Sequence, residues 1–137
     1  MTFASKTKVS VEQTRAEVER TLARYGAKSF AYFTEDGRAI ILFEATDRRI
    51  RFDLPLPKGE SDKDAQQRRQ KWRALLLCIK AKLESVDSKI ETFEEAFLAH
   101  VVMPDGITVG QHTKSMIGQA YKEGKMVPLL PAPTKNT

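Results

Sequence analysis

The segment "FAYFTEDGRAIILFEATDRRIRFDLPLP", residues 30–57, decides the fold class. Apolar and polar side chains alternate along much of it, a pattern typical of β-strands with two different faces. Asp36 and Gly37 predict a tight hairpin of type I′, because both residues tolerate the positive φ that this turn needs at its two central positions. A weaker turn is expected at residues 45–48, and Pro55 and Pro57 end the sheet because they lack a backbone N–H. The segment therefore predicts a three-stranded antiparallel meander, with strands at about residues 29–34, 38–44 and 48–54.

The two turns fix which side chains share a face, since directly opposed residues lie on the same side of a sheet. The first turn pairs Tyr32 with Ile41, and the second pairs Ile41 with Phe52. The face that they share is apolar and is the expected core side; it carries Phe30, Tyr32, Ile41, Phe43, Ile50, Phe52 and Leu54. The opposite face is mixed; it carries Ala31, Phe33, Ile40, Leu42, Glu44, Arg49, Arg51 and Asp53.

Helix signals flank the meander on both sides. Capping boxes, each a Ser or Thr with Glu or Gln three residues later, predict helices that begin after Ser10, Thr92 and Thr108. Gly26 and Gly124 mark the ends of the first and the last of these helices. A long helix is expected at about residues 63–86, because its apolar side chains fall on one stripe; they are Trp72, Leu75, Leu76, Ile79, Leu83 and Val86. The predicted fold class is α+β: an N-terminal helix, a three-stranded antiparallel β-meander, a long amphipathic helix and two shorter C-terminal helices.

Length and composition indicate one soluble globular domain. A chain of 137 residues with 41% hydrophobic residues is long enough to bury a core, and we expect this domain to span residues 1–127. Residues 128–137 are proline-rich and are expected to form an extended or disordered tail. The longest apolar run, residues 74–79, is far too short to cross a membrane. The N-terminus lacks the apolar core of a signal peptide, and the single Cys78 cannot form an internal disulfide. We therefore expect a cytoplasmic protein.

The charge is basic overall and unevenly distributed. Lys and Arg number 23 against 18 acidic residues, a net charge of +5 that suits a nucleic-acid partner without requiring one. Residues 68–82 carry six cations and no acid, whereas residues 84–95 carry five acids and one lysine. Neighbouring blocks of this kind are expected to neutralise each other when the chain folds.

The mixed face of the sheet has two interpretations. In the first, a helix covers Phe33 and its aliphatic neighbours, and Glu44 pairs with Arg49 across the strands, which contributes about 0–1 kcal/mol. In the second, the face binds single-stranded nucleic acid, with Phe33 stacked on a base and Arg49 and Arg51 holding phosphates. The first interpretation fits better, because sheets that bind single strands usually carry two or three aromatic side chains.

The long helix offers a second cationic patch and an unexplained outer face. Arg69, Arg73 and Lys80 lie on one flank, where they either contact nucleic acid or lay their aliphatic stems along the apolar stripe. Leu77 lies on the far side of the helix with small neighbours, where it could contact another layer, another protein or a second copy of the chain.

Nothing in the sequence points to catalysis or to a bound cofactor. The P-loop, the Rossmann glycine pattern and the nucleophile elbow are all missing. His100 and His112 do not have the spacing of a metal site, and one cysteine with two histidines cannot complete a structural zinc site. Cys78 lies in an apolar run and is expected to be buried and inert. We therefore expect a protein that is not an enzyme and that has no catalytic residues, metal or cofactor.

Three stretches carry a resemblance to a known family: "RIRFDLPLP" (residues 49–57), "RRQKWRALLLCIKAKLESVDS" (residues 68–88) and "ETFEEAFLAHVVMPDGITVG" (residues 91–110). From about residue 11 to residue 130, the chain resembles small uncharacterised proteins encoded by tailed bacteriophages, prophages and mobile elements. The resemblance implies a phage accessory protein in a bacterial host cell, acting near replication, recombination or evasion of host defence. It implies no catalytic residues.

Two functions remain open at this point. The first is a non-enzymatic accessory protein that binds nucleic acid, preferably single-stranded, through a basic sheet face and helix flank; the residues concerned are Phe33, Arg49, Arg51, Arg69, Arg73 and Lys80. The alternative is a protein-binding module that inhibits a host nuclease or defence complex and whose tail, residues 128–133, could dock as an extended segment. A homodimer is compatible with both functions.

Overall fold

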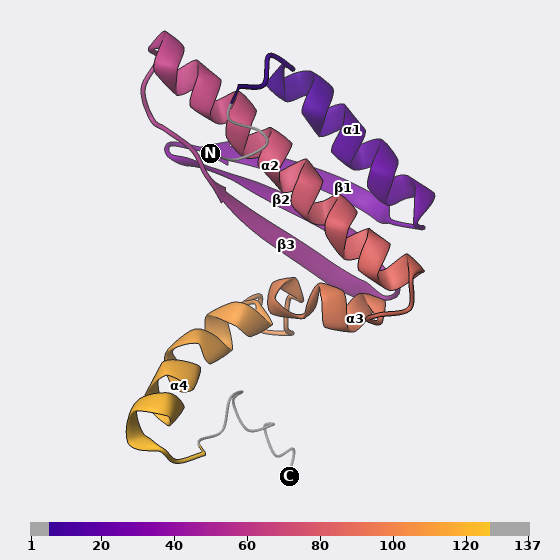
Figure 1. The fold of residues 1–137 in the computed structure, drawn as a ribbon, viewed down its shortest axis with the longest axis vertical. Coiled ribbons are helices and arrows are strands. Elements are labelled where there is room, and N and C mark those ends of the chain that lie inside the picture. Colours follow the sequence, from indigo (N-terminus) through magenta and orange to yellow (C-terminus); the bar gives the residue numbers. More distant parts are fainter. Residues whose placement is uncertain (1–5, 127–137) are drawn as a thin grey trace.

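The computed structural model describes residues 6–126 as an α+β fold, and this confirms the predicted fold class. The elements are, in chain order, α1 (Val11–Arg24), β1 (Lys28–Glu35), β2 (Arg38–Ala45), β3 (Arg48–Pro55), α2 (Asp62–Asp87), α3 (Phe93–Ala96), the 3-10 helix η1 (Leu98–His100) and α4 (Val109–Glu123). Helices α1 and α2 lie side by side across one face of the sheet, and α3 lies at one end of it (Figure 1). The predicted tail, residues 128–137, lies outside the described residues.

The sheet has the order β1-β2-β3 and the predicted register. Tyr32 is opposite Ile41, and Ile41 is opposite Phe52. The prediction of a type I′ turn at Asp36 and Gly37 is wrong, because only Gly37 has a positive φ, of 86°. The second turn instead has positive φ at both of its central residues, Thr46 (50°) and Asp47 (58°). Both loops contain two residues, so the assignment of side chains to faces is unaffected.

The core lies between the sheet and the two long helices. Each predicted core-side residue of the sheet is buried or half-buried, and the stripe of α2 contributes Trp72, Leu75, Leu76, Ile79 and Leu83. Phe97 follows α3 and is fully buried, with its ring edge-on to Phe43 at 6.1 Å and to Phe52 at 6.3 Å between centroids. Edge-to-face contacts of this kind add to the stabilisation from burial. Phe97 therefore fastens the α3 segment to the end of the sheet.

The first helix ends as predicted. The backbone N–H of Ala27 donates to the Leu22 carbonyl and that of Gly26 to the Ala23 carbonyl, with Gly26 at a φ of 87°. This Schellman-type ending needs a left-handed residue, a role that glycine fills without strain.

Cys78 on α2 is exposed, so the prediction that it is buried is wrong. The apolar run around it is continuous in sequence, but successive helical residues rotate by about 100°. Leu75, Leu76 and Ile79 therefore face the core, while Leu77 and Cys78 point away from it.

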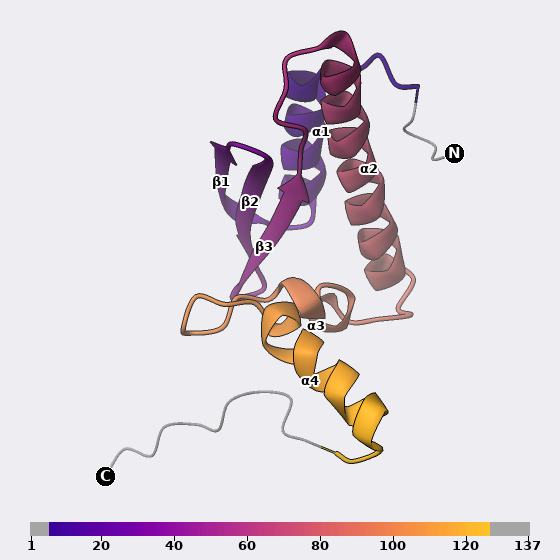
Figure 2. The same cartoon turned by 90° about the vertical axis from the view of Figure 1, so that its left-hand side faces the viewer.

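Helix α4 differs from the other two long helices, α1 and α2, because none of its residues is buried. It points away from the sheet and from α1 and α2, and within residues 6–126 only its first turns lie near η1 and the sheet (Figures 1 and 2). Its ends follow the sequence signals: Thr108 caps the first turn, and Gly124 adopts the left-handed conformation after the last. Within residues 6–126, no helix has the length and apolar character needed to cross a membrane.

Candidate functional site

The outer face of the sheet is open. Helices α1 and α2 cover the opposite face, and within residues 6–126 no helix covers this one (Figure 2). The expected covering helix is therefore not found. The Phe33 side chain is 53% exposed, and the neighbouring Ile40 and Leu42 are half-buried. A shallow hollow of about 220 Å³ lies beside them, between β1 and β2 and next to Arg49.

Each arginine on this face has a carboxylate close to it. The predicted pair of Arg49 with Glu44 is present at 3.9 Å between Nε and Oε1. Arg51 Nε lies 3.4 Å from Asp53 Oδ1. Arg38 Nε donates to Glu35 Oε2 at 2.8 Å across the first turn. The outer face thus has an apolar centre surrounded by ion pairs whose charges cancel.

Arg51 also connects the sheet to the start of α4. One of its terminal nitrogens donates to the Gln111 side-chain oxygen at 2.9 Å, and the other donates to the Gly106 carbonyl at 3.3 Å. Its side chain is only 21% exposed. The Arg51 guanidinium, which we predicted to hold a phosphate, is therefore occupied within the chain, whereas the Arg49 side chain is 63% exposed.

A hollow of about 490 Å³ lies next to Arg51, between β3, η1 and α4. His100 forms part of its wall, stacked on Phe52 with 4.0 Å between ring centroids. Burial lowers the pKa of His100, and the nearby Lys82 lowers it further. The Arg51 carbonyl oxygen, 3.2 Å from His100 Nδ1, and the charge of Asp53 oppose this shift. The hollow favours a neutral imidazole.

The predicted helix patch is on the other side of the molecule, because α2 covers the core face of the sheet. Arg73 pairs with Glu17 of α1 at 2.9 Å. Arg69 donates to Gln66 in its own helix. Lys80 remains exposed. The structure therefore brings Phe33, Arg49 and Arg51 together on one face, but it does not bring them together with Arg69, Arg73 and Lys80.

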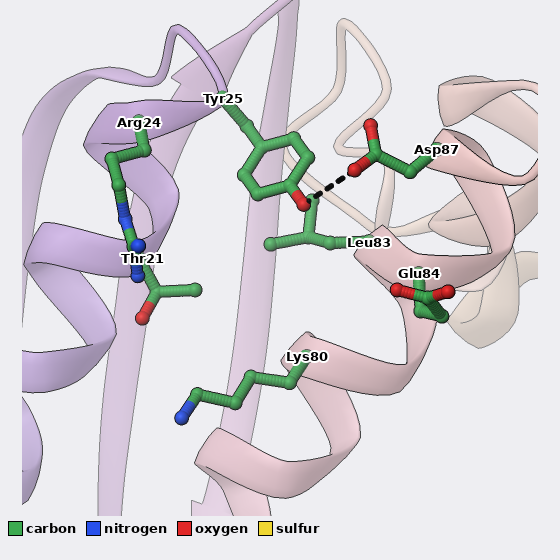
Figure 3. A pocket seen from close by; sticks show the side chains of 7 residues that line it. All are labelled: Thr21, Arg24, Tyr25, Lys80, Leu83, Glu84 and Asp87. Atoms are coloured by element: carbon green, nitrogen blue, oxygen red, sulfur yellow. Dashed lines mark hydrogen bonds between the residues drawn. The ribbon is translucent and has the colours of Figure 1, made fainter.

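Lys80 is part of a groove between α1 and α2 of about 590 Å³ (Figure 3). The groove is lined by Thr21, Arg24, Tyr25, Lys80, Leu83, Glu84 and Asp87. The Tyr25 hydroxyl donates to Asp87 Oδ2 at 3.0 Å across its upper end, and this hydrogen bond raises the pKa of Tyr25. Two cations and two carboxylates line the groove, so its charge gives no preference for an anion.

The basic and acidic blocks of the sequence do not neutralise each other, contrary to expectation. In the basic block, Arg73 pairs with α1, and Lys82 donates to the Ala96 carbonyl at 2.9 Å. In the acidic block, Glu94 pairs with Arg48 of β3 at 2.7 Å. The other acids of the block accept hydrogen bonds from hydroxyl or backbone groups, which leave their negative charge in place. Lys80 and Glu84 are one turn apart on α2 and line the same groove, but no ion pair joins them within the described residues.

Sequence reasoning missed two features of this region. Glu35 and Arg38 are opposite each other across a two-residue turn, and the predicted register already contained that signal. The bonds from Arg51 to Gly106 and Gln111 had no local signal, because these partners are 55 and 60 residues away.

Comparison of the sequence with protein-family models found no match, and comparisons with curated proteins and with solved structures found none either. The resemblance to phage-encoded proteins therefore stays a prediction. Among residues 6–126, no three His, Cys, Asp or Glu side chains come together in a group that could hold a metal ion.

Proposed function

We propose that the protein acts by binding another protein, with the outer face of the sheet as its docking surface. The observation that carries this proposal is the open apolar strip of Phe33, Ile40 and Leu42, surrounded by ion pairs. Protein interfaces commonly have an apolar centre that is depleted in charge and a polar rim. A partner that covers Phe33 would remove its exposed ring from water, and aromatic side chains are frequent anchors of binding energy.

The balance of charge favours a protein over a nucleic acid at this surface. Binding to a phosphate backbone depends on cations that displace counterions. On the outer face, Arg38, Arg49 and Arg51 are each matched by a carboxylate. A protein surface can accept such a neutral pattern, with the ion pairs fixing its orientation.

Nucleic acid is the second candidate, and Arg49 is the observation that favours it. Its side chain is 63% exposed, and its contact with Glu44 is the longest of the three, at 3.9 Å. A phosphate could replace that carboxylate. Phe33 is on the same face, with a ring exposed enough to stack on a base. The net charge of +5 would assist the encounter.

A photo-crosslinking amino acid at position 33, in the cells that produce the protein, tests the proposal. We expect a protein adduct that survives nuclease treatment and that is lost when Leu42→Arg is added. The same crosslinker at position 71 is the matched control, because Lys71 is exposed on α2, which covers the opposite face of the sheet. It should not give that adduct.

Fluorescence anisotropy with labelled single-stranded DNA, duplex DNA and RNA tests the second candidate function, nucleic-acid binding. Affinity that falls steeply with salt and is lost in Arg49→Glu, together with no adduct at position 33, would overturn the protein-binding proposal. Weak binding that is unchanged by Arg49→Glu would support it.

A further inference from the structure

The chain itself closes one edge of the sheet, the edge formed by β3. The Val102 backbone N–H donates to the carbonyl oxygen of Arg49 at 2.8 Å, and the carbonyl oxygen of Arg51 lies 3.2 Å from His100 Nδ1. Both carbonyls belong to alternate residues of β3 that point away from β2. The segment that contains η1 therefore occupies backbone groups that β3 would otherwise leave without a partner.

The opposite edge of the sheet, formed by β1, is open. Strand β1 lies at the side of the sheet farthest from β3 (Figure 2). Within the part of the chain that the structure describes, no backbone hydrogen bond joins residues 28–35 to any element other than β2. Helix α1 reaches the side chain of Tyr32, whose hydroxyl donates to the Arg15 carbonyl at 3.3 Å, but it does not bond to the backbone of the strand.

The register shows which backbone groups point outward from β1. The Leu56 N–H donates to the Gly37 carbonyl at 2.9 Å, so odd-numbered residues of β2 bond to β3 and even-numbered ones bond to β1. Their partners in β1 are the odd-numbered residues. The N–H and C=O groups of Phe30, Tyr32 and Thr34 therefore point away from the sheet.

Strand β1 also buries less than its neighbours do. Strands β2 and β3 each contain several buried residues, whereas β1 contains none. On the core side, Phe30 and Tyr32 are half-buried, and their rings stack with 5.9 Å between centroids. On the outer face, Phe33 is 53% exposed. A strand placed beside β1 would therefore cover apolar side chains on both faces of the sheet.

The middle of β1 lacks the features that usually protect an edge strand, which are charges, proline and bulges. At its start, the exposed Lys28 and an irregular register with Ser29 at a φ of 59° oppose pairing. Residues 30–34, "FAYFT", contain no charge, no proline and no glycine. These five residues are long enough for a typical strand pairing and consist mainly of residues that favour strands.

We propose that β1 accepts an extended segment of the partner protein as a fourth strand of the sheet. Alternating outward donors and acceptors match an extended backbone, whereas a helix has already paired its own backbone groups internally. The segment has at least five residues, no charge in its middle, and apolar side chains at alternate positions beside Phe33 on the outer face. This inference rests on the proposed function and names the part of the partner that makes the contact.

Octapeptides selected from a displayed random library against the intact protein are the probe. We expect apolar residues to alternate in the selected peptides. Thr34→Pro removes an outward N–H, at an edge position where proline is tolerated, and should weaken peptide binding at least about tenfold. Thr34→Ala is the matched control, because it removes the side chain and keeps the N–H, and it should bind as the wild type does. Urea denaturation verifies that both variants are folded.

Methylation of the peptide's own amides provides a second test. A paired strand directs alternate N–H groups toward its neighbour and the others away from it. Methyl groups on one alternate set of peptide nitrogens should therefore abolish binding, while methyl groups on the other set should leave it unchanged. Hydrogen–deuterium exchange should show new protection at the amides of Phe30, Tyr32 and Thr34 when the unmethylated peptide is bound.

Four results would overturn strand pairing with the partner protein. The selection could yield no binding octapeptide, or binding could be unchanged in Thr34→Pro. Both sets of methylated peptides could bind equally. Light scattering could show a dimer that Thr34→Pro dissociates, which would assign the edge of β1 to a second copy of the chain.

Photo-crosslinking at position 33 distinguishes failure of strand pairing from failure of the proposed function. An adduct that is lost when Thr34→Pro is added, but kept with Thr34→Ala, would support strand pairing in the cell. An adduct that persists with Thr34→Pro would leave the docking surface in place and overturn strand pairing alone. The absence of any protein adduct at position 33 would overturn both.

Discussion

The body of the molecule, residues 10–101, and its arm, residues 107–126, differ in what holds them in place. The body has a closed core in which α1, α2 and the α3 segment pack on one face of the sheet. The arm begins with a good cap and ends with a good glycine, but it buries no residue of its helix. Local signals thus suffice to specify where a helix begins and ends, while burial determines how much it contributes to stability. The body therefore maintains the fold, and the arm contributes little to it.

The largest expected effect comes from deleting a core ring. Phe97→Ala removes a fully buried side chain that contacts both Phe43 and Phe52, and it should lower the free energy of unfolding by about 3–5 kcal/mol. Tyr121→Ala is the matched deletion in the arm, where Tyr121 is 88% exposed, and should cost less than about 0.5 kcal/mol. Urea denaturation measures the free energy of unfolding of both variants. Equal losses would contradict the distinction between body and arm.

An intermediate effect is expected where the two regions meet. Arg51→Ala removes the bonds to Gly106 and Gln111 and should cost about 1–3 kcal/mol. Arg49→Ala removes only an exposed pair and should cost less than about 1 kcal/mol. Urea denaturation compares the free energies of unfolding of the two variants. Proteolysis within residues 102–108 should be faster in Arg51→Ala but not in Arg49→Ala. If the two variants are equally stable, Arg51 is not the connection between sheet and arm.

The smallest expected effect is a pH dependence from His100. Burial lowers its pKa below the ordinary 6.5, so the unfolded chain binds the proton more readily than the folded one. The free energy of unfolding should therefore fall as the pH drops below about 6.5, until the lowered pKa is passed. In His100→Phe, which keeps a ring next to Phe52, this part of the pH dependence should disappear. A dependence that is unchanged in His100→Phe would assign it to other groups.

The sequence predicted the faces of the sheet because side chains alternate with a period of two and both turns contain two residues. The same reasoning correctly predicted the ion pair of Glu44 with Arg49. The prediction failed for Cys78, because the apolar run is continuous in sequence but the rotation of the helix turns Cys78 away from the core. It also failed for the charge blocks, because the partners of Arg73 and Glu94 are on distant elements. Contacts between segments that are far apart in sequence, such as Arg51 with Gln111, depend on how whole elements dock.

The exposure of α4 could not be predicted for a related reason. Val109, Ile117 and Tyr121 recur at helical spacing, a pattern that is the same whether the apolar side packs on its own chain or on another molecule. Only the direction in which α4 leaves the body distinguishes these cases (Figure 1).

Hydrogen–deuterium exchange of the intact protein tests the contrast between body and arm most directly. We expect the amides of α2 and the sheet to be strongly protected. The amides of α4 should exchange much faster, because this helix has no buried residue. Protection of α4 equal to that of α2 would contradict this division, because it would mean that the arm is as stable as the body.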